Sequence, residues 1–223
     1  MLRIGLTGGI ACGKSLVAAM FRDRGVPVVD DDDAARDAVA PGSEGLAAVV
    51  GEFGDGILLP DGGLDRPALG RIVFADDTKR RRLMEITHPR IGALIAERLG
   101  AAQASGASMV VYESALLVEN GVADAWRPLV VVRADHEQQV TRIASRNGLD
   151  RGEAEHRIRS QMAVDEKAAL ADYVIDNSGS PAEARAHFEE VFEALAVLGP
   201  DRPATAGRSA RGERARRSRA SRG

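Results

Sequence analysis

The sequence predicts an α/β fold in which helices flank a parallel sheet. Short apolar runs rich in β-branched residues recur along the chain, and segments with helical periodicity separate them. This alternation is typical of a parallel sheet, because each parallel connection needs a crossover, usually a helix. The predicted strands cover residues 2–7, 26–30, 109–113, 129–133 and 173–176.

The interval between the second and third predicted strands is long. Residues 31–108 separate them, whereas a crossover needs roughly a dozen residues. Three stretches within it are typical of helices, AARDAVA, SEGLAAVVGEF and TKRRRLMEITHPRIGALIAERL, and LLPDGGLDRP is a turn-rich break. We therefore expect a helical insertion over about 34–106, within a core formed by residues 1–33 and 107–199.

The chain after the fourth predicted strand is mainly helical. The stretches DHEQQVTRIASR and DRGEAEHRIRSQMAVDEKAAL meet at Asn147-Gly148, and PAEARAHFEEVFEALAVL closes the fold. The turn between the first two stretches suggests a mobile lid over about 146–165. No internal repeat of 20 to 50 residues is present.

Composition favours a cytoplasmic location. No run approaches the roughly 18 to 20 uninterrupted apolar residues of a membrane span, and no basic segment followed by an apolar stretch opens the chain. The lone Cys12 has no partner for an internal disulfide. We expect no membrane association.

The charge is unevenly distributed. Residues 200–223 carry a net charge of +6 and no Val, Ile, Leu or aromatic residue, whereas residues 1–199 carry −9. A segment with so little apolar surface cannot offset the entropy cost of ordering, which predicts a disordered tail. Such a tail is either a solvated extension or a segment that contacts nucleic acid or anionic surfaces by charge. We expect the solvated extension, with no nucleic-acid partner.

A glycine-rich motif follows the first strand. Residues 8–15 fit G-x-x-x-x-G-K-[ST] between a predicted strand and a predicted helix, the context expected of a phosphate-binding loop. Backbone N–H groups of such a loop surround an anion, the lysine reaches the terminal phosphates, and the serine hydroxyl ligates Mg²⁺. The alternative is a glycine turn without a ligand. The expected nucleotide-binding residues are Gly8, Gly9, Ile10, Ala11, Cys12, Gly13, Lys14, Ser15 and Leu16.

Absent motifs narrow the class of phosphate-loop protein. The chain has no Asn-Lys-x-Asp quartet, which reads guanine in GTPases. No apolar strand ends in a paired Asp-Glu, as in motor-type ATPases, and MVVYES ends in the single acid Glu113. These absences favour a small kinase.

An acidic run, Asp30 to Asp33, follows the second predicted strand, which we expect beside the first strand in the sheet. In an extended chain Asp30 and Asp32 point the same way, so one can order Mg²⁺-bound water while the other accepts a hydroxyl proton. Asp33 is expected to cap the helix AARDAVA instead.

Arginines cluster around the Asn147-Gly148 turn. A lid that carries them can bring guanidinium groups to the transferring phosphoryl group, which needs charge stabilisation more than covalent help. The alternative is a solvated helical face balanced by acidic neighbours. The cluster consists of Arg142, Arg146, Arg151, Arg157 and Arg159.

The ordered motifs of the chain resemble those of dephospho-CoA kinases. The matching segments are GLTGGIACGKS, VVDDDDAARDAVAPG, LDRPALGRIVF, the HP of ITHPRI, LLVENG, QQVTRIASRNG, RIRSQ and ADYVIDNSG, within about residues 1–197. The resemblance implies a phosphate-loop NTPase core like that of nucleoside monophosphate kinases, with an inserted substrate domain and a lid. It also implies transfer of a phosphoryl group from ATP to the ribose 3'-hydroxyl of dephospho-CoA with Mg²⁺, the last step of coenzyme A synthesis.

The resemblance assigns roles to single residues. Asp32 is the expected base for the acceptor hydroxyl, with Asp30 beside it, and Lys14 and Arg142 are the expected phosphate-contacting catalytic residues. Asn177, with the Ser-Gly that follows, falls where the family holds the adenine of ATP. Two matches lie on the substrate domain: His88 of His88-Pro89, either a substrate contact or a turn that starts a new helix, and Arg66 of Leu64-Asp65-Arg66, a substrate contact or a structural element.

Three features depart from the family pattern: Asp31 stands where a small residue is usual, Ala115 stands where a proline is usual, and the arginine-rich tail has no counterpart. Cys12 also allows two interpretations. It is either a small filler beside Gly13 or, near backbone N–H groups and a helix N-terminus, an oxidation-sensitive thiolate.

Other functions are compatible with parts of the pattern. A nucleoside monophosphate or shikimate kinase would share the core, and a nucleotide-binding regulator would use the basic tail on RNA. The expected partners are the small molecules ATP and dephospho-CoA, and the expected state is a monomer or a small homo-oligomer.

Overall fold

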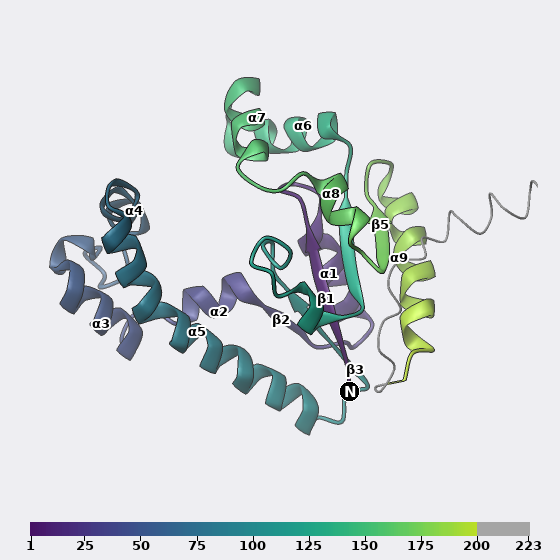
Figure 1. Cartoon of the computed structure of the whole chain (residues 1–223), viewed down its shortest axis with the longest axis horizontal. Helices are drawn as coiled ribbons and strands as arrows, with labels where there is room; N and C mark the ends of the chain where they lie inside the picture. The colour runs from purple at the N-terminus through teal and green to yellow at the C-terminus, as the bar shows by residue number, and fades with distance from the viewer. Residues whose placement is uncertain (200–223) are drawn as a thin grey trace, which may run out of the picture. The chain divides into compact units, whose positions relative to one another are not determined.

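The computed structural model of the chain describes residues 1–199 (Figure 1). The predicted tail, residues 200–223, lies outside the described residues. The described residues form two compact units: the first contains residues 1–28 and 106–199, and the second contains residues 29–105. Within residues 1–199 no helix has both the length and the apolar character needed to cross a membrane.

The first unit is built on a parallel sheet. The strand order is β2-β3-β1-β4-β5, and β1 pairs in parallel with β3 and β4, as β4 does with β5. The strands are β1 (Leu2–Gly8), β2 (Val28–Asp30), β3 (Met109–Glu113), β4 (Leu129–Arg133) and β5 (Tyr173–Asp176). The predicted parallel α/β fold is therefore confirmed. The expectation that the first two strands are adjacent in the sheet is wrong, because β3 lies between them.

Helices cover the sheet of the first unit. Phe21 of α1 contacts Phe188 of α9 edge to face, with ring centroids 5.0 Å apart, so these two helices share one apolar layer with the sheet. The α-helices of this unit are α1 (Lys14–Asp23), α6 (His136–Asn147), α7 (Arg151–Arg159), α8 (Val164–Ala169) and α9 (Pro181–Ala196), with a 3-10 helix, η2, at Ala123–Trp126.

The sequence predicts one helical stretch from 150 to 170, but the structure divides it into α7 and α8. The chain leaves the helical path at residues 160–163. There the Gln161 side chain accepts a hydrogen bond from the N–H of Ile10, and the N–H of Met162 donates to Glu119. These bonds to distant segments, which helical periodicity does not reveal, accompany the break.

The second unit is helical and has its own apolar core around Val49, Ile57 and Ile86. Its helices are α2 (Asp31–Asp37), α3 (Glu44–Phe53), η1 (Asp55–Ile57), α4 (Arg66–Ala75) and α5 (Asp77–Ala104). The long α5 contains Pro89 without ending there, as the helical stretch predicted over residues 78–99 implies, so the turn is the wrong alternative for His88-Pro89. Proline has no backbone N–H to donate within the helix. In the same turn, the Arg90 guanidinium donates to the carbonyl of Ile86 at 2.7 Å.

Candidate active site

The candidate site lies at the carboxyl edge of the parallel sheet in the first unit. β1 ends at Gly8 and passes into the glycine-rich loop, β3 ends at Glu113, and β5 ends one residue before Asn177. In parallel sheets the carboxyl ends of the strands share one edge, where ligands bind. The fold thus brings together three segments that are far apart in the sequence.

The loop leads into a helix N-terminus that no side chain caps. Gly13 is the N-cap residue of α1, with φ 91, and an added Cβ would lie 2.1 Å from the Asn177 side-chain nitrogen. Glycine is therefore required there for both conformation and space. The uncapped N–H groups of the first turn and the positive end of the helix dipole favour an anion.

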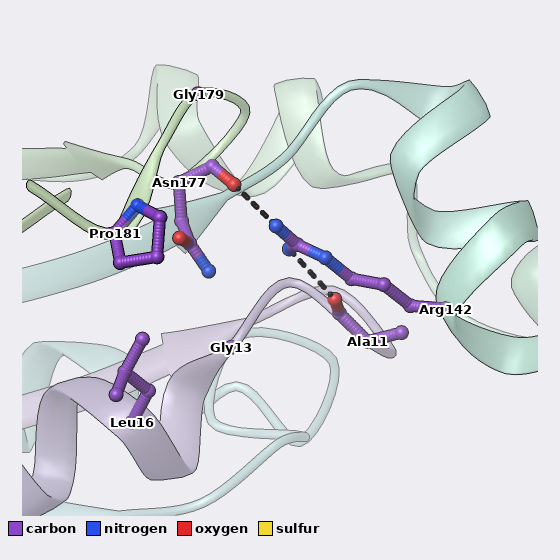
Figure 2. A pocket seen from close by; sticks show the side chains of 7 residues that line it. All are labelled: Ala11, Gly13, Leu16, Arg142, Asn177, Gly179 and Pro181. Carbon is purple, nitrogen blue, oxygen red and sulfur yellow. Dashed lines mark hydrogen bonds between the residues drawn. The ribbon is translucent and has the colours of Figure 1, made fainter. Parts of the chain in front are cut away.

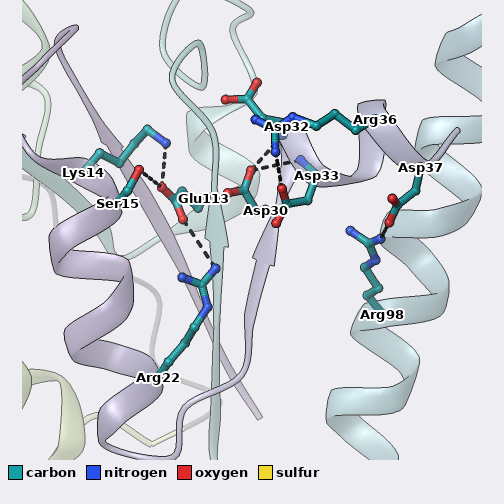
Figure 3. A network of polar contacts seen from close by, with 10 residues as sticks. All are labelled: Lys14, Ser15, Arg22, Asp30, Asp32, Asp33, Arg36, Asp37, Arg98 and Glu113. Atoms are coloured by element: carbon teal, nitrogen blue, oxygen red, sulfur yellow. Dashed lines mark hydrogen bonds and ion pairs between the residues drawn. The ribbon is translucent and has the colours of Figure 1, made fainter. Parts of the chain in front are cut away.

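Lys14 and Ser15 both approach the buried carboxylate of Glu113 (Figure 3). The Lys14 ammonium lies 2.7 Å from Glu113 Oε1 and the Ser15 hydroxyl 3.5 Å from the same oxygen, while Glu113 is 1% exposed. Arg22 lies 3.8 Å from Oε2, which makes no hydrogen bond within residues 1–199. A carboxylate with spare acceptor capacity is thus held beside the two residues that the loop motif assigns to phosphate and metal.

The sequence-based assignments omitted Glu113 as a site residue. The signal was present, since MVVYE is a buried strand that ends in an acid. The sequence does not reveal how β3 aligns with β1. In the structure Glu113 pairs with Leu6, so the end of β3 lies beside the end of β1, where the loop begins.

A pocket of about 270 Å³ lies beside the loop (Figure 2). The Arg142 guanidinium lies at its wall and donates to the carbonyls of Ala11 at 3.3 Å and Asn177 at 2.9 Å. The Asn177 amide in turn donates to the carbonyl of Cys12 at 2.8 Å. The pocket is lined by Ala11, Gly13, Leu16, Arg142, Asn177, Gly179 and Pro181.

Two glutamines hold the middle of the loop. The N–H of Ile10 donates to Gln161 Oε1 at 3.1 Å, and its carbonyl accepts from Gln139 Nε2 at 2.8 Å. The next residue, Ala11, has a φ of 58, in the left-handed region that side chains other than glycine seldom occupy. Within residues 1–199 it is the only non-glycine residue with positive φ. Such local strain persists only where surrounding contacts enforce it.

Cys12 is a core residue rather than a reactive thiol. Its side chain is fully buried among apolar residues, and this burial raises the pKa of the thiol to about 11, against lowering contributions from hydrogen bonds and nearby charges. The thiol therefore stays protonated near neutral pH. The thiolate hypothesis is wrong, because the side chain points into the core beneath the loop.

The aspartate run belongs to the second unit and begins a helix there. Asp30 is the N-cap residue of α2, and its carboxylate accepts from the N–H groups of Asp32 at 2.8 Å and Asp33 at 3.3 Å. Asp33 lies inside the first turn and pairs with Arg36 (Figure 3). The prediction that Asp33 caps the helix is wrong, as is the expectation of an extended chain through Asp32, because β2 ends one residue before the helix begins.

The side chain of Asp32 is accessible. It is exposed on the first turn of α2, and no other residue within 1–199 hydrogen-bonds its carboxylate. Asp30 is committed as the cap, and Asp33 to an ion pair.

The family was identified by comparison with known proteins. A family model described as dephospho-CoA kinase matches residues 2–183. The chain belongs to the dephospho-CoA kinase family. A dephospho-CoA kinase of Geobacter sulfurreducens is 49% identical over 85% of this chain and 96% of its own length. One of Arabidopsis thaliana is 45% identical over 85% of this chain and 82% of its own.

Two solved structures are similar to this chain, and one of them is a dephospho-CoA kinase. A dephospho-CoA kinase from Campylobacter jejuni is 27% identical, with a TM-score of 0.65 over 86% of this chain and 96% of its own. A structure from Thermus thermophilus is 35% identical, with a TM-score of 0.72 over 87% and 97% of the two chains. The chain is thus a phosphate-loop kinase of coenzyme A biosynthesis.

Of the arginines that the sequence singled out, Arg142 alone makes a described contact with the loop of this kinase. Arg151 pairs with Glu137 and Glu155, and Arg159 also contacts Glu155, on exposed surfaces of α6 and α7. The Arg151 hydrogen bond holds the pKa of Glu137 below its usual range. Arg146 contacts its neighbour Asn147. These four arginines, Arg157 included, are all exposed.

The two residues expected to contact the acceptor of a dephospho-CoA kinase, His88 and Arg66, lie in the second unit. His88 is exposed on α5, and Arg66 is the exposed first residue of α4. In the Leu-Asp-Arg motif the cap is Asp65, which accepts from the N–H of Ala68 at 2.9 Å. Asp65 therefore has a structural role, and the side chain of Arg66 faces solvent.

Proposed function

We propose that this kinase transfers the γ-phosphoryl group of ATP to the ribose 3'-hydroxyl of dephospho-CoA, giving CoA and ADP. The observation that carries this proposal is the arrangement of Lys14, Ser15 and Glu113 at the uncapped N-terminus of α1. Positive charge and free N–H groups converge there on one point at the sheet edge, as transfer of a phosphoryl group requires.

The ATP site in this proposal combines the loop with the adjoining pocket. Residues 8–15 surround the phosphates, and Lys14 exchanges its contact with Glu113 for the terminal phosphates. The adenine enters the pocket between Leu16 and Pro181, whose apolar surfaces suit a flat base. Asn177 contributes by fixing the loop carbonyl of Cys12, which supports the assignment of this residue to the nucleotide site.

The residues present fit a magnesium ion that arrives with the nucleotide. Within residues 1–199 no three carboxylate, histidine or cysteine side chains gather into a metal site of their own. Mg²⁺ needs no such site when it is held by substrate phosphates together with one or two protein oxygens. Ser15 Oγ and the orphaned Oε2 of Glu113 are hard oxygen donors of this kind. The ion would neutralise charge on the transferring group.

Asp32 is the proposed base for the acceptor hydroxyl. Its carboxylate is exposed, while Asp30 caps α2 and Asp33 pairs with Arg36, so Asp32 has the free acceptor oxygens that proton removal needs. His88 and Arg66 are proposed to contact the acceptor elsewhere in the second unit. We also propose that 146–165 acts as the lid and that the enzyme works in the cytoplasm as a monomer or small homo-oligomer.

A panel of acceptors tests the proposal. ADP release is measured with Mg-ATP and dephospho-CoA, AMP, shikimate or no acceptor, and the product is identified by mass spectrometry and phosphorus NMR. The expected result is that, of these acceptors, only dephospho-CoA supports turnover, and that its product is phosphorylated at the ribose 3' position. Turnover with another acceptor and none with dephospho-CoA would overturn it.

A further inference from the structure

A fully buried lysine lies close to the proposed site and has no part in the chemistry proposed above. Lys167, on α8, is 0% exposed. Its ammonium lies 2.6 Å from Glu119 Oε1 and donates to the carbonyl of Ala115 at 2.8 Å. A buried ammonium is costly unless it is paired and hydrogen-bonded, so these two contacts are what the position requires.

Lysine is rare in this chain, so a buried lysine is unusual here. Among 30 basic residues only three are lysines: Lys14 in the phosphate loop, Lys79 on the surface and Lys167. The other basic residues in this count are all arginines. A planar guanidinium is larger than an ammonium and has a fixed fork of donors, whereas Lys167 places a compact charge between one carboxylate and one carbonyl.

The Lys167 contacts fix the segment that directly follows Glu113. Ala115 lies two residues after Glu113, and its carbonyl accepts from Lys167 and, at 3.1 Å, from the hydroxyl of Thr7 on β1. The N–H of Ser114 donates to the carbonyl of Leu6. The chain leaving β3 is thus tied to β1 and α8 immediately beyond the carboxylate that contacts Lys14.

The same ion pair reaches the phosphate loop from the other side. Glu119 Oε1, which pairs with Lys167, also accepts from the N–H of Met162 at 3.3 Å. The residue before Met162 is Gln161, whose side chain accepts from the N–H of Ile10 in the loop. One ion pair, whose lysine is fully buried, therefore connects both to the segment that follows Glu113 and, through Gln161, to the phosphate loop.

We propose that Lys167 and Glu119 form a positioning pair for phosphoryl transfer, which holds the Glu113 segment and the phosphate loop in their working geometry. The pair acts through other residues: mainly through the segment that follows Glu113, and also through Met162 and Gln161. This inference rests on the proposed function, since the geometry it maintains is that of the kinase site.

The first test is a kinetic double-mutant cycle with Lys167→Met and Glu113→Gln. We expect Lys167→Met to lower kcat about 10²-fold, the scale of a small misplacement of catalytic groups, with KM for ATP and acceptor little changed. In the Glu113→Gln background the same substitution should lower kcat far less, because both changes remove one function. A merely structural lysine would give losses that multiply, or a kcat equal to that of the wild type, and either result overturns the proposal.

Matched variants separate positioning from general damage. Lys79→Met removes an exposed lysine of the second unit and is expected to leave kcat unchanged. Thr7→Val removes the other donor to the Ala115 carbonyl without touching a charge, and should lower kcat less than Lys167→Met. If Lys167→Met does not fold, Glu119→Gln keeps an acceptor for Met162 but removes the charge, and must reproduce the fall in kcat. Wild-type kcat in a folded Glu119→Gln enzyme then overturns the proposal.

A second measurement does not depend on turnover. Hydrogen–deuterium exchange of the Lys167→Met enzyme should be faster in residues 114–122, with β1 and β4 unchanged. Unchanged exchange in that segment overturns the proposal. If the wild-type enzyme fails to phosphorylate dephospho-CoA, the proposed function is wrong, and the exchange experiment still decides whether Lys167 holds the segment.

Discussion

The phosphate loop and the aspartate helix hold their charges in opposite ways. In the first unit Glu113 is 1% exposed and Lys14 is 14% exposed, and the loop is fixed by hydrogen bonds: its backbone accepts from Gln139 and Asn177 and donates to Gln161. In the second unit the ion pairs of α2, Asp33 with Arg36 and Asp37 with Arg98, are largely exposed. Hydrogen bonds and buried charges fix the phosphate loop, whereas α2 presents its charges to solvent.

Under the proposed function, this difference assigns stabilisation of the phosphoryl group to the loop and proton removal to α2. Electrostatic stabilisation of a phosphoryl group is most effective when donors are fixed in a low-dielectric setting, which the loop provides. A base for the acceptor must instead be reachable, and a solvent-facing carboxylate on a helix is reachable. Substitutions in the loop should therefore disturb structure and ATP binding together, whereas substitution of Asp32 on α2 should disturb chemistry alone.

The largest expected effect comes from Asp32→Asn. Loss of the proposed base should lower kcat by about 10² to 10⁴-fold, the usual contribution of general base catalysis, while ATP affinity and the melting temperature stay unchanged. Steady-state kinetics with calorimetric ATP titration measures both. Asp33→Asn is the matched control in the same turn, and should stay close to wild type because its partner Arg36 is an exposed surface group. Equal losses in the two variants would contradict the assignment.

Among substitutions in the phosphate loop, Gly13→Ala should lower the free energy of unfolding most. The left-handed φ of 91 costs an alanine about 1–2 kcal/mol, and the clash with the Asn177 side chain adds about 1–3 kcal/mol. Thermal and urea unfolding measure the loss, and ATP binding should weaken with it. Gly25→Ala isolates the first term, because Gly25 has φ 75 and open space around its Cβ position. A Gly13→Ala enzyme no less stable than Gly25→Ala would rule out the clash.

Arg142→Met should weaken nucleotide binding by a smaller factor. The guanidinium joins the carbonyls of Ala11 and Asn177 across the pocket, and hydrogen bonds from a charged group contribute about 1.5–3 kcal/mol. We expect KM for ATP to rise about 10-fold. Arg146→Met serves as the control, since Arg146 is exposed on the same helix and contacts only Asn147 among residues 1–199. A similar KM change in both variants would assign the effect to lost surface charge.

The smallest expected effect concerns Cys12. Because burial raises the pKa of its thiol to about 11, the thiolate is scarce at pH 8, roughly one part in 10³. Iodoacetamide should leave the native enzyme unmodified and fully active at that pH, with or without ATP. Denatured enzyme should react at the rate of a free thiol, which mass spectrometry of the Cys12 peptide measures. Rapid modification of the native enzyme would show that the side chain is not held in the core.

Local pattern was enough for much of the fold. The strands predicted at 109–113, 129–133 and 173–176 match β3, β4 and β5, because β-branched apolar runs encode buried strands directly. The glycine loop was predictable for a similar reason, since its spacing reflects a backbone shape that few sequences allow. The order of the strands in the sheet was not predictable in this way, because β3 inserts between β1 and β2.

Details of the site were less predictable where a shift of one residue in the end of a strand changes the role of a side chain. Asp30 rather than Asp33 caps α2, because the end of β2 determines which carboxylate meets the first N–H groups. Pro89 remains inside α5, where an arginine side chain bonds a carbonyl near the missing donor. The cap at Asp30 does not follow from residue propensity, whereas the helix through Pro89 agrees with the helical pattern on both sides of the proline.

The parallel α/β core, the phosphate loop and the resemblance to dephospho-CoA kinases could all be read from the sequence, because short-range pattern and ordered motifs carry that information. Three findings needed the folded chain: Glu113 faces Lys14, Cys12 points into the core, and Lys167 is buried against Glu119. Each of these depends on contacts between segments far apart in the chain, and burial and pairing of charges arise only when such segments meet.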